Sequence, residues 1–223
     1  MMKAYIEPLL LPERLYTAAD VTGRPSLVPA QPGVYGWYFD EPPPNVDITE
    51  CHRCGAMVLL YVGISPKAPP GNGRAASRST LRQRLRTHYA GNAEGSTLRR
   101  TLGCLLGQHL GIELRRVGHG SRYTFTNPGE RVLDEWMHQH AFVTWVEADR
   151  PWEIEQHLLS SELRLPLNMD GSPWPEAVGV LRTIRLQARL AADQLSIIAD
   201  SGGPRRDVSK SKPLPTSPTK TGS

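Results

Sequence analysis

Five polar side chains in this chain have types and spacings suited to chemistry on a phosphate group. They are two distant tyrosines, Tyr35 and Tyr61, then Arg84 one helical turn before His88, and much later Glu155. A guanidinium can bind two phosphate oxygens at once, and a carboxylate can hold a divalent cation. A tyrosine oxygen near a cation or a histidine can accept a proton despite its ordinary pKa of about 10. These types therefore fit hydrolysis of a phosphodiester bond.

Short motifs surround these residues and make the pattern more specific. In chain order they are Gly33-Val34-Tyr35, Tyr61-Val62-Gly63, Leu81-x-x-Arg84, Glu155-x-x-Leu158-Leu159 and Pro166-x-Asn168. The two tripeptides alone are weak evidence, whereas the arginine helix and the glutamate helix ending in Pro-x-Asn make the match specific. Over about residues 32–170 the chain resembles the GIY-YIG nuclease family.

The resemblance implies an α+β fold, in which a small three-stranded antiparallel sheet is flanked by helices and carries the active site on one face. It also implies a metal-dependent endonuclease, a hydrolase acting on phosphodiester bonds with Mg²⁺ or Mn²⁺. The segment at 91–100 is similar to one in a bacterial subgroup of the family, so we expect a bacterial protein.

The resemblance also assigns catalytic positions, which are Tyr35, Tyr61, Arg84, His88, Glu155 and Asn168. We hypothesise that Tyr35, assisted by His88, deprotonates or orients the attacking water. Arg84 and Tyr61 would bind the scissile phosphate, and Glu155 would be the metal ligand. Asn168 would order the site.

Some of these assignments have alternatives. A tyrosine in a strand often only packs, a glutamate on a helix is often a surface charge, and a histidine at a helix end such as His88 can cap carbonyls. Glu153 is the rival of Glu155 as metal ligand. The spacing to the two leucines and to Asn168 favours Glu155.

Charge is unevenly distributed along the chain. The net charge is +4, but residues 67–122 hold 11 Lys and Arg against 2 Asp and Glu, and residues 123–200 hold 6 against 12. The basic block indicates either a phosphate-facing surface or a solvated helix face. We expect its nucleic-acid-binding members to be Lys67, Arg74, Arg78, Arg82, Arg86, Arg99 and Arg100.

Local patterns predict the elements that position these residues. We expect strands at 33–39, 56–64 and 141–146, paired strands at 112–117 and 122–126, and helices beginning near residues 79, 97, 127 and 152. Ser96 and Asn127 are the expected caps of the second and third helices. A long helix at 177–198 has an apolar stripe that either packs on its own domain or forms a homodimer seam.

We divide the chain into an N-terminal extension (1–30), a GIY-YIG-like domain (31–172), a C-terminal helix (173–200) and a disordered basic tail (201–223). An insert in the domain carries Cys51 and Cys54. This pair could supply half of a zinc site, but no second pair follows nearby, so free thiols are favoured. Three cysteines are too few for a disulfide scaffold.

The apolar runs are too short to span a membrane, and no signal-peptide pattern is present, so we expect a cytoplasmic protein. The leading hypothesis is an endonuclease that cuts DNA in restriction, repair or mobile-element processing. We expect double-stranded DNA as the partner, with RNA as an open alternative. The alternative is a catalytically inactive nucleic-acid-binding protein with the same fold. A third possibility is an interaction protein that acts through the helix at 177–198.

Overall fold

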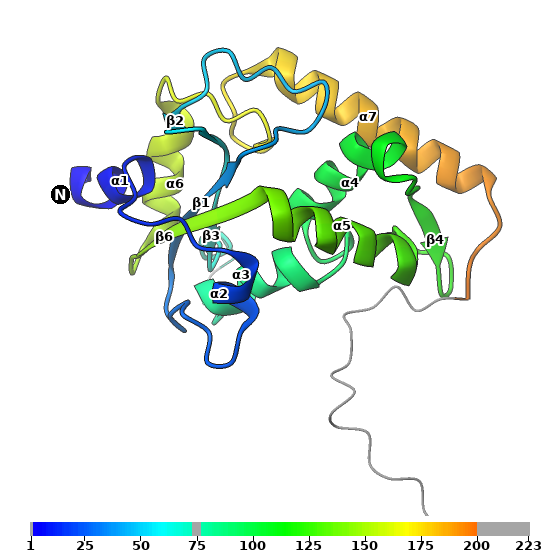
Figure 1. The fold of residues 1–223 in the computed structure, drawn as a ribbon, viewed down its shortest axis with the longest axis horizontal. Helices are drawn as coiled ribbons and strands as arrows, with labels where there is room; N and C mark the ends of the chain where they lie inside the picture. Colours follow the sequence, from blue (N-terminus) through cyan, green and yellow to red (C-terminus); the bar gives the residue numbers. More distant parts are fainter. Residues whose placement is uncertain (1, 73–76, 200–223) are drawn as a thin grey trace, which may run out of the picture.

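The computed structural model describes residues 2–72 and 77–199 (Figure 1). The tail at 201–223 and Arg74 lie outside these described residues. The helices are α1 (Lys3–Leu10), α2 (Ala18–Thr22), α3 (Leu81–Ala90), α4 (Thr97–Leu110), α5 (Thr126–His140), α6 (Pro151–Ser160) and α7 (Pro175–Gln194). The strands are β1 (Gly33–Phe39), β2 (Arg53–Cys54), β3 (Met57–Ser65), β4 (Arg115–Val117), β5 (Arg122–Thr124) and β6 (Ala141–Glu147).

The main sheet is antiparallel, with β1 between β3 and β6 and with β2 outside β3. All seven residues of β1 are buried, as expected for an aromatic and β-branched run covered on both faces. The prediction of three strands was incomplete. The fourth strand, β2, has two residues and lies in the insert, where Gly55 at φ 60° allows the turn into β3.

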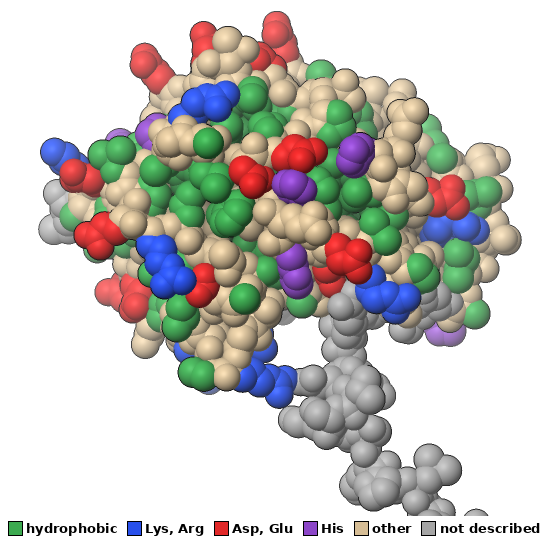
Figure 2. Space-filling model, viewed as in Figure 1, with side chains coloured by type: hydrophobic (Ala, Val, Ile, Leu, Met, Phe, Trp, Pro, Cys, Tyr) green, Lys and Arg blue, Asp and Glu red, His purple; other side chains and the backbone are tan. Residues whose placement is uncertain are grey.

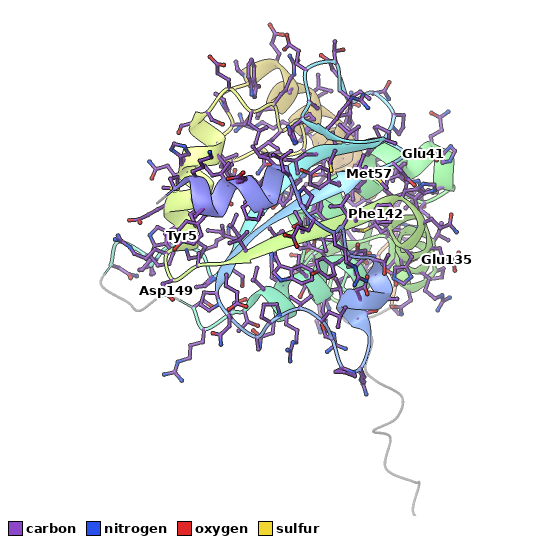
Figure 3. The ribbon with its side chains drawn as sticks, turned by 60° about the vertical axis from the view of Figure 1, so that its left-hand side comes forward. Tyr5, Glu41, Met57, Glu135, Phe142 and Asp149 are labelled. Carbon is purple, nitrogen blue, oxygen red and sulfur yellow. The ribbon has the colours of Figure 1, made fainter. Side chains whose placement is uncertain are left out.

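Helices cover both faces of the sheet. Because alternate residues of a strand face opposite sides, Val34 and Tyr38 of β1 pack with α1 and α6, whereas Tyr35 and Trp37 pack with α3 and α4. In Figure 3, α1 lies across the first of these faces, and the labelled residues Tyr5, Met57 and Phe142 pack there from α1, β3 and β6. Tyr35 therefore belongs to the α3 side of the sheet.

The start of α5 differs from the prediction. Asn127 does not cap this helix, because the helix already begins at Thr126 and its N-cap position, Phe125, forms no side-chain cap. Glu130 explains the difference: its Oε1 accepts hydrogen bonds from the backbone amides of Ala93 and Phe125. Tertiary contacts of one glutamate thus replace the expected local cap.

The long helix α7 packs along α4 (Figure 1). Leu181 is buried, and Ile184 and Ala188 are partly buried against the larger core, so most of the predicted apolar stripe is covered by the same chain. Leu186 and Leu190, on the outer side, are more than half exposed. A homodimer through this helix stays a prediction. Among the described residues, no helix has the length and apolar character needed to cross a membrane.

The surface charges are not evenly mixed. On the face that Figure 2 shows, Asp and Glu side chains gather with histidines over α5, while Lys and Arg are scattered. For example, Nδ1 of His140 lies 3.1 Å from a carboxylate oxygen of Asp40 and 3.5 Å from one of Glu41. This face offers no continuous basic surface to a polyanion.

Candidate active site

Two tyrosines and a histidine meet on the α3 side of the sheet. Tyr35 of β1 and Tyr61 of β3 share this face, and their ring centroids are 6.5 Å apart. His88 of α3 covers both rings, at 5.5 Å from Tyr35 and 6.3 Å from Tyr61. Its Nε2 is 2.8 Å from the hydroxyl oxygen of Tyr35, which is a hydrogen bond. The structure thus brings together three of the predicted residues.

The glycine of the second motif makes room for this hydroxyl. Gly63 pairs with Tyr35 across the two strands. A Cβ atom at Gly63 would lie 2.6 Å from the Tyr35 hydroxyl oxygen and 2.9 Å from the Tyr61 ring, closer than van der Waals contact allows. A glycine at this position lets both tyrosines occupy the same face.

Both ring nitrogens of His88 are engaged. Nδ1 is 2.7 Å from the hydroxyl of Ser96, which also accepts the backbone N–H of Arg99 as the N-cap of α4. Burial lowers the pKa of His88 well below 6.5, and the charges of Arg84 and Arg99 lower it further. The imidazole is therefore neutral near pH 7, with one acceptor nitrogen. It contacts Tyr35 and Ser96 through its ring rather than capping carbonyls.

A cavity of about 350 Å³ opens beside this cluster. Its walls include Tyr61 from β3, Arg84 from α3 and Glu155 from α6. Tyr35 is 1% exposed and does not line the cavity; it is buried beside Tyr61, which does line it, with 6.5 Å between the two ring centroids. Burial raises the pKa of Tyr61 to about 12, although the nearby charge of Arg84 lowers it. Arg84 itself donates to the carbonyl of Gly95 at 3.1 Å.

Glu155, rather than Glu153, faces the cavity. Glu153 is exposed and pairs with Arg150 at 2.6 Å. Burial raises the pKa of Glu155 to about 7, with a further increase from Asp170 and opposite effects from Lys67 and Arg84. Asp170 also lines the cavity and was not among the predicted site residues. The available signal was a carboxylate two residues after the predicted asparagine.

The residues present fit a divalent cation. Two carboxylates border one cavity, and the charged form of one of them is disfavoured by burial until a positive charge compensates it. Carboxylate oxygens are hard ligands, and Mg²⁺ commonly takes one or two of them together with waters. Among the described residues there is no cluster of three or more His, Cys, Asp or Glu side chains that could hold a metal. The fit is therefore to an ion such as Mg²⁺ and not to a site made wholly of protein ligands.

Asn168 positions β3. Its Oδ1 accepts the backbone N–H of Val62 at 2.9 Å, and its Nδ2 donates to the carbonyl of Val62 at 2.8 Å. The preceding residue, Leu167, donates its N–H to the carbonyl of Leu60. The asparagine side chain thus holds Val62 with both polar atoms, and the backbone of Leu167 holds Leu60 on the other side of Tyr61, which fits an ordering role.

The predicted nucleic-acid contact of Arg99 was wrong. This side chain is fully buried and pairs with Glu130 and Asp134 at 2.7 and 2.8 Å. It also donates to the carbonyls of His88 and Tyr89 at the end of α3. A buried and fully engaged guanidinium cannot reach a phosphate, so Arg99 instead fixes the helix that carries the histidine.

Two further arginines of the basic block face away from the cavity. Arg82 and Arg86 lie on the opposite side of α3 from Arg84, because two residues correspond to about 200° around a helix. They donate to the carbonyls of Val28 and Thr22, at 2.7 and 3.1 Å. We therefore remove both from the expected nucleic-acid surface.

The other members of the block lie on or near the cavity side or outside the described residues. Lys67 lines the cavity, and Arg100 lies on α4, one turn after Thr97 of the cavity wall. Arg78 precedes α3 in an exposed segment. Cys51 and Cys54 in the insert are free thiols, and burial raises the pKa of Cys51 to about 11.

Comparison with known families identifies a catalytic domain in this chain. The model of the GIY-YIG catalytic domain matches residues 33–187, which is more than half of the chain and extends beyond residue 172 into α7. No curated protein and no solved structure matches.

Proposed function

The chain belongs to the GIY-YIG family, and from this we propose that it is a divalent-metal-dependent endonuclease that hydrolyses phosphodiester bonds of DNA. One observation carries the proposal: Tyr61, Arg84 and Glu155 line one cavity, and the hydrogen-bonded Tyr35–His88 pair is buried next to Tyr61. Restriction, repair and mobile-element processing are the processes in which such an activity would serve.

The cavity supplies a cationic grip for the phosphate. Arg84 can place two N–H donors on phosphate oxygens, and Lys67 adds a second positive charge at the rim. The hydroxyl of Tyr61 is kept protonated by its raised pKa, so it can donate a hydrogen bond to the same group. Together these donors would stabilise the charge that develops as the phosphorus becomes five-coordinate.

The Tyr35–His88 pair can accept the proton of the attacking water. Burial raises the pKa of Tyr35 well above 10, so the tyrosine is protonated before the reaction begins. Tyr35 therefore passes its own proton to Nε2 of His88 while its oxygen takes one from water, or it orients the water through the same hydrogen bond. Ser96 holds the imidazole from the other side.

Glu155, with Asp170 beside it, would hold the cation. A bound Mg²⁺ or Mn²⁺ would neutralise charge on the phosphate and the leaving oxygen. Asn168 keeps β3, and so Tyr61, in register with the cavity.

A plasmid-nicking assay tests the proposal. The wild type should relax supercoiled DNA with Mg²⁺, and Arg84→Ala and Glu155→Ala should each lose at least about 10²-fold in rate. Glu153→Gln is the matched control, since this exposed glutamate is on the same helix. If the wild type binds supercoiled, branched and single-stranded DNA but cleaves none of them, the proposed endonuclease activity is rejected. The alternative of a catalytically inactive nucleic-acid-binding protein then remains.

A further inference from the structure

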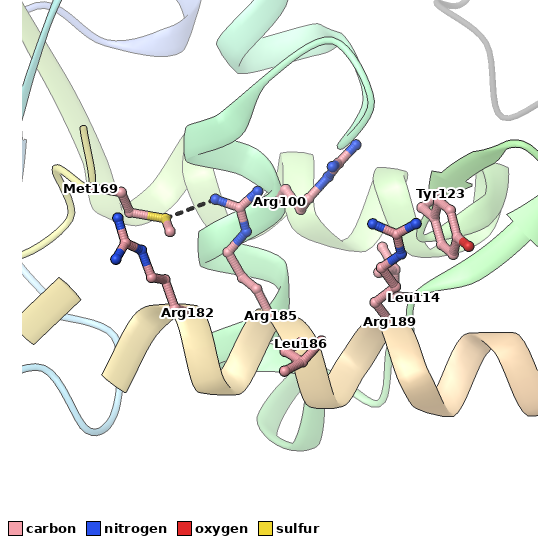
Figure 4. Close-up of a pocket in the computed structure, with 8 residues that line it drawn as sticks. All are labelled: Arg100, Leu114, Tyr123, Met169, Arg182, Arg185, Leu186 and Arg189. Atoms are coloured by element: carbon pink, nitrogen blue, oxygen red, sulfur yellow. Dashed lines mark hydrogen bonds between the residues drawn. The ribbon is translucent and has the colours of Figure 1, made fainter. Parts of the chain in front are cut away.

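Beside the catalytic cavity lies a second cavity whose walls are rich in arginine (Figure 4). Its volume is about 250 Å³, and it lies between α4 and α7. Four arginines surround it: Arg100 from α4 and Arg182, Arg185 and Arg189 from α7. We call these four residues the arginine groove.

The three arginines of α7 share one side of the helix. Their spacing of three and four residues places them one above another, and in Figure 4 they project from α7 toward α4. From Arg182 to Arg189 the helix rises about 10 Å. Measured along the duplex axis, where one strand carries a phosphate about every 3.4 Å, that length corresponds to about three phosphates.

Little negative charge opposes the groove. Within the described part of the chain, Arg182 and Arg189 form no ion pair, and both are exposed. Arg189 lies over the ring of Tyr123, at 5.0 Å, and Arg100 pairs with Glu94 at 2.8 Å. The guanidinium of Arg185 contacts the sulfur of Met169, and burial together with the charge of Arg100 lowers the pKa of Arg185. Among the described residues, Arg182, Arg185 and Arg189 form no ion pair, and like charges held together in this way favour an anionic ligand.

The groove adjoins the catalytic cavity. Met169 lines both, and it directly follows Asn168. The first turn of α4 also borders both, since Thr97 lines the catalytic cavity and Arg100 lines the groove. A nucleic-acid strand with one phosphate at Arg84 would therefore run next past these arginines.

We propose that the arginine groove binds the phosphodiester backbone of the DNA duplex beside the scissile phosphate, and so positions the substrate across the catalytic cavity. The inference rests on the proposed function, because it takes the substrate to be a nucleic acid. It assigns to α7 a binding role in place of the dimer seam. Leu114 and Leu186, which also line the groove, offer apolar contact to the deoxyribose faces.

The test measures binding of the full-length chain to a labelled duplex of about two helical turns, without divalent cation so that no cleavage occurs. Arg182→Gln/Arg189→Gln changes only exposed side chains, so folding should be kept. We expect affinity to fall at least about tenfold and the slope of log affinity against log salt to become shallower by about 2. Arg182→Lys/Arg189→Lys keeps the charges and should keep most of the affinity and the slope.

Arg131→Gln is the matched control, since Arg131 is an exposed arginine on α5 that does not line the groove. If the double glutamine variant keeps the wild-type affinity and salt slope, the proposed DNA-binding role of the groove is rejected, while the nuclease proposal stands. Weakened binding by that variant, alongside a wild type that cuts no DNA, would support the groove and reject the enzyme. A wild type that does not bind the duplex would reject the groove.

Discussion

Two small details of the site explain why the tyrosines can act together. The Tyr35 hydroxyl points at His88, and its space exists only because residue 63 has no side chain. The sequence identified both tyrosines through short motifs. It could not reveal that Tyr61 lines the cavity while Tyr35 is buried beside it, since this depends on α3 and on the hydrogen bond to His88.

Gly63→Ala tests how strongly activity depends on the placement of Tyr35. The added methyl would lie 2.6 Å from the Tyr35 hydroxyl oxygen, so the ring must move. A displacement of this size can cost about 10²-fold in rate. Nicking rates of Gly63→Ala should show this loss. Gly179→Ala on α7, where an added Cβ meets nothing within 4 Å, should keep the wild-type rate. Equal rates for the two variants would contradict the role of this contact.

The neutral state of buried His88 predicts a pH dependence of stability. Its pKa is lowered in the folded chain, so between the folded value and about 6.5 the unfolded chain binds more protons. The free energy of unfolding should therefore fall as the pH drops below about 6.5. Urea titrations from pH 7.5 to 5 should show a flatter dependence for His88→Gln. The exposed His157→Gln is the control and should keep the wild-type slope; a wild-type slope in His88→Gln would count against a buried neutral imidazole.

At the scale of elements, the sequence predicted those that are set by local patterns. The strand at 33–39 is confirmed, and so is the helix from Thr97 with its Ser96 cap. The missed features depend on contacts from elsewhere in the chain. The two-residue β2 exists only because it pairs with β3. The start of α5 depends on Glu130, whose carboxylate accepts hydrogen bonds from the Arg99 side chain and from the backbone N–H of Ala93.

Arg99 links three elements, and its loss should show in stability. It joins Glu130 and Asp134 of α5 to the end of α3. Arg99→Met would remove the cation that compensates the buried carboxylates of Glu130 and Asp134, and breaking a buried ion pair in this way typically costs about 3–5 kcal/mol. Arg100→Met, next to it, breaks a pair with the exposed Glu94 and should cost about 1 kcal/mol or less. Urea unfolding of both variants would reject this view if the two losses were equal.

At the scale of the whole molecule, charge along the chain does not map simply onto surfaces. The basic block at 67–122 has a net charge of +9, yet Arg99 is buried in ion pairs and Arg82 and Arg86 face away from the cavity. Three of the four groove arginines come instead from residues 123–200, where acidic residues are in excess. Folding brings arginines from both segments together, so counting charges along the sequence could not have located the arginine groove.

In the proposed function, different charges serve DNA binding and the metal. The cationic contacts come from α3, α4, α7 and the loop with Lys67, whereas the acidic residue proposed for the cation is on α6. Glu155→Gln should therefore abolish nicking and leave duplex affinity unchanged or slightly higher, because it removes a negative charge beside the phosphate. For about four phosphate contacts, raising the salt from 50 to 200 mM should weaken binding about a hundredfold in both proteins. Anisotropy titrations at several salt concentrations measure this, and a large loss of affinity in Glu155→Gln would show that the two sets of charges do not act separately.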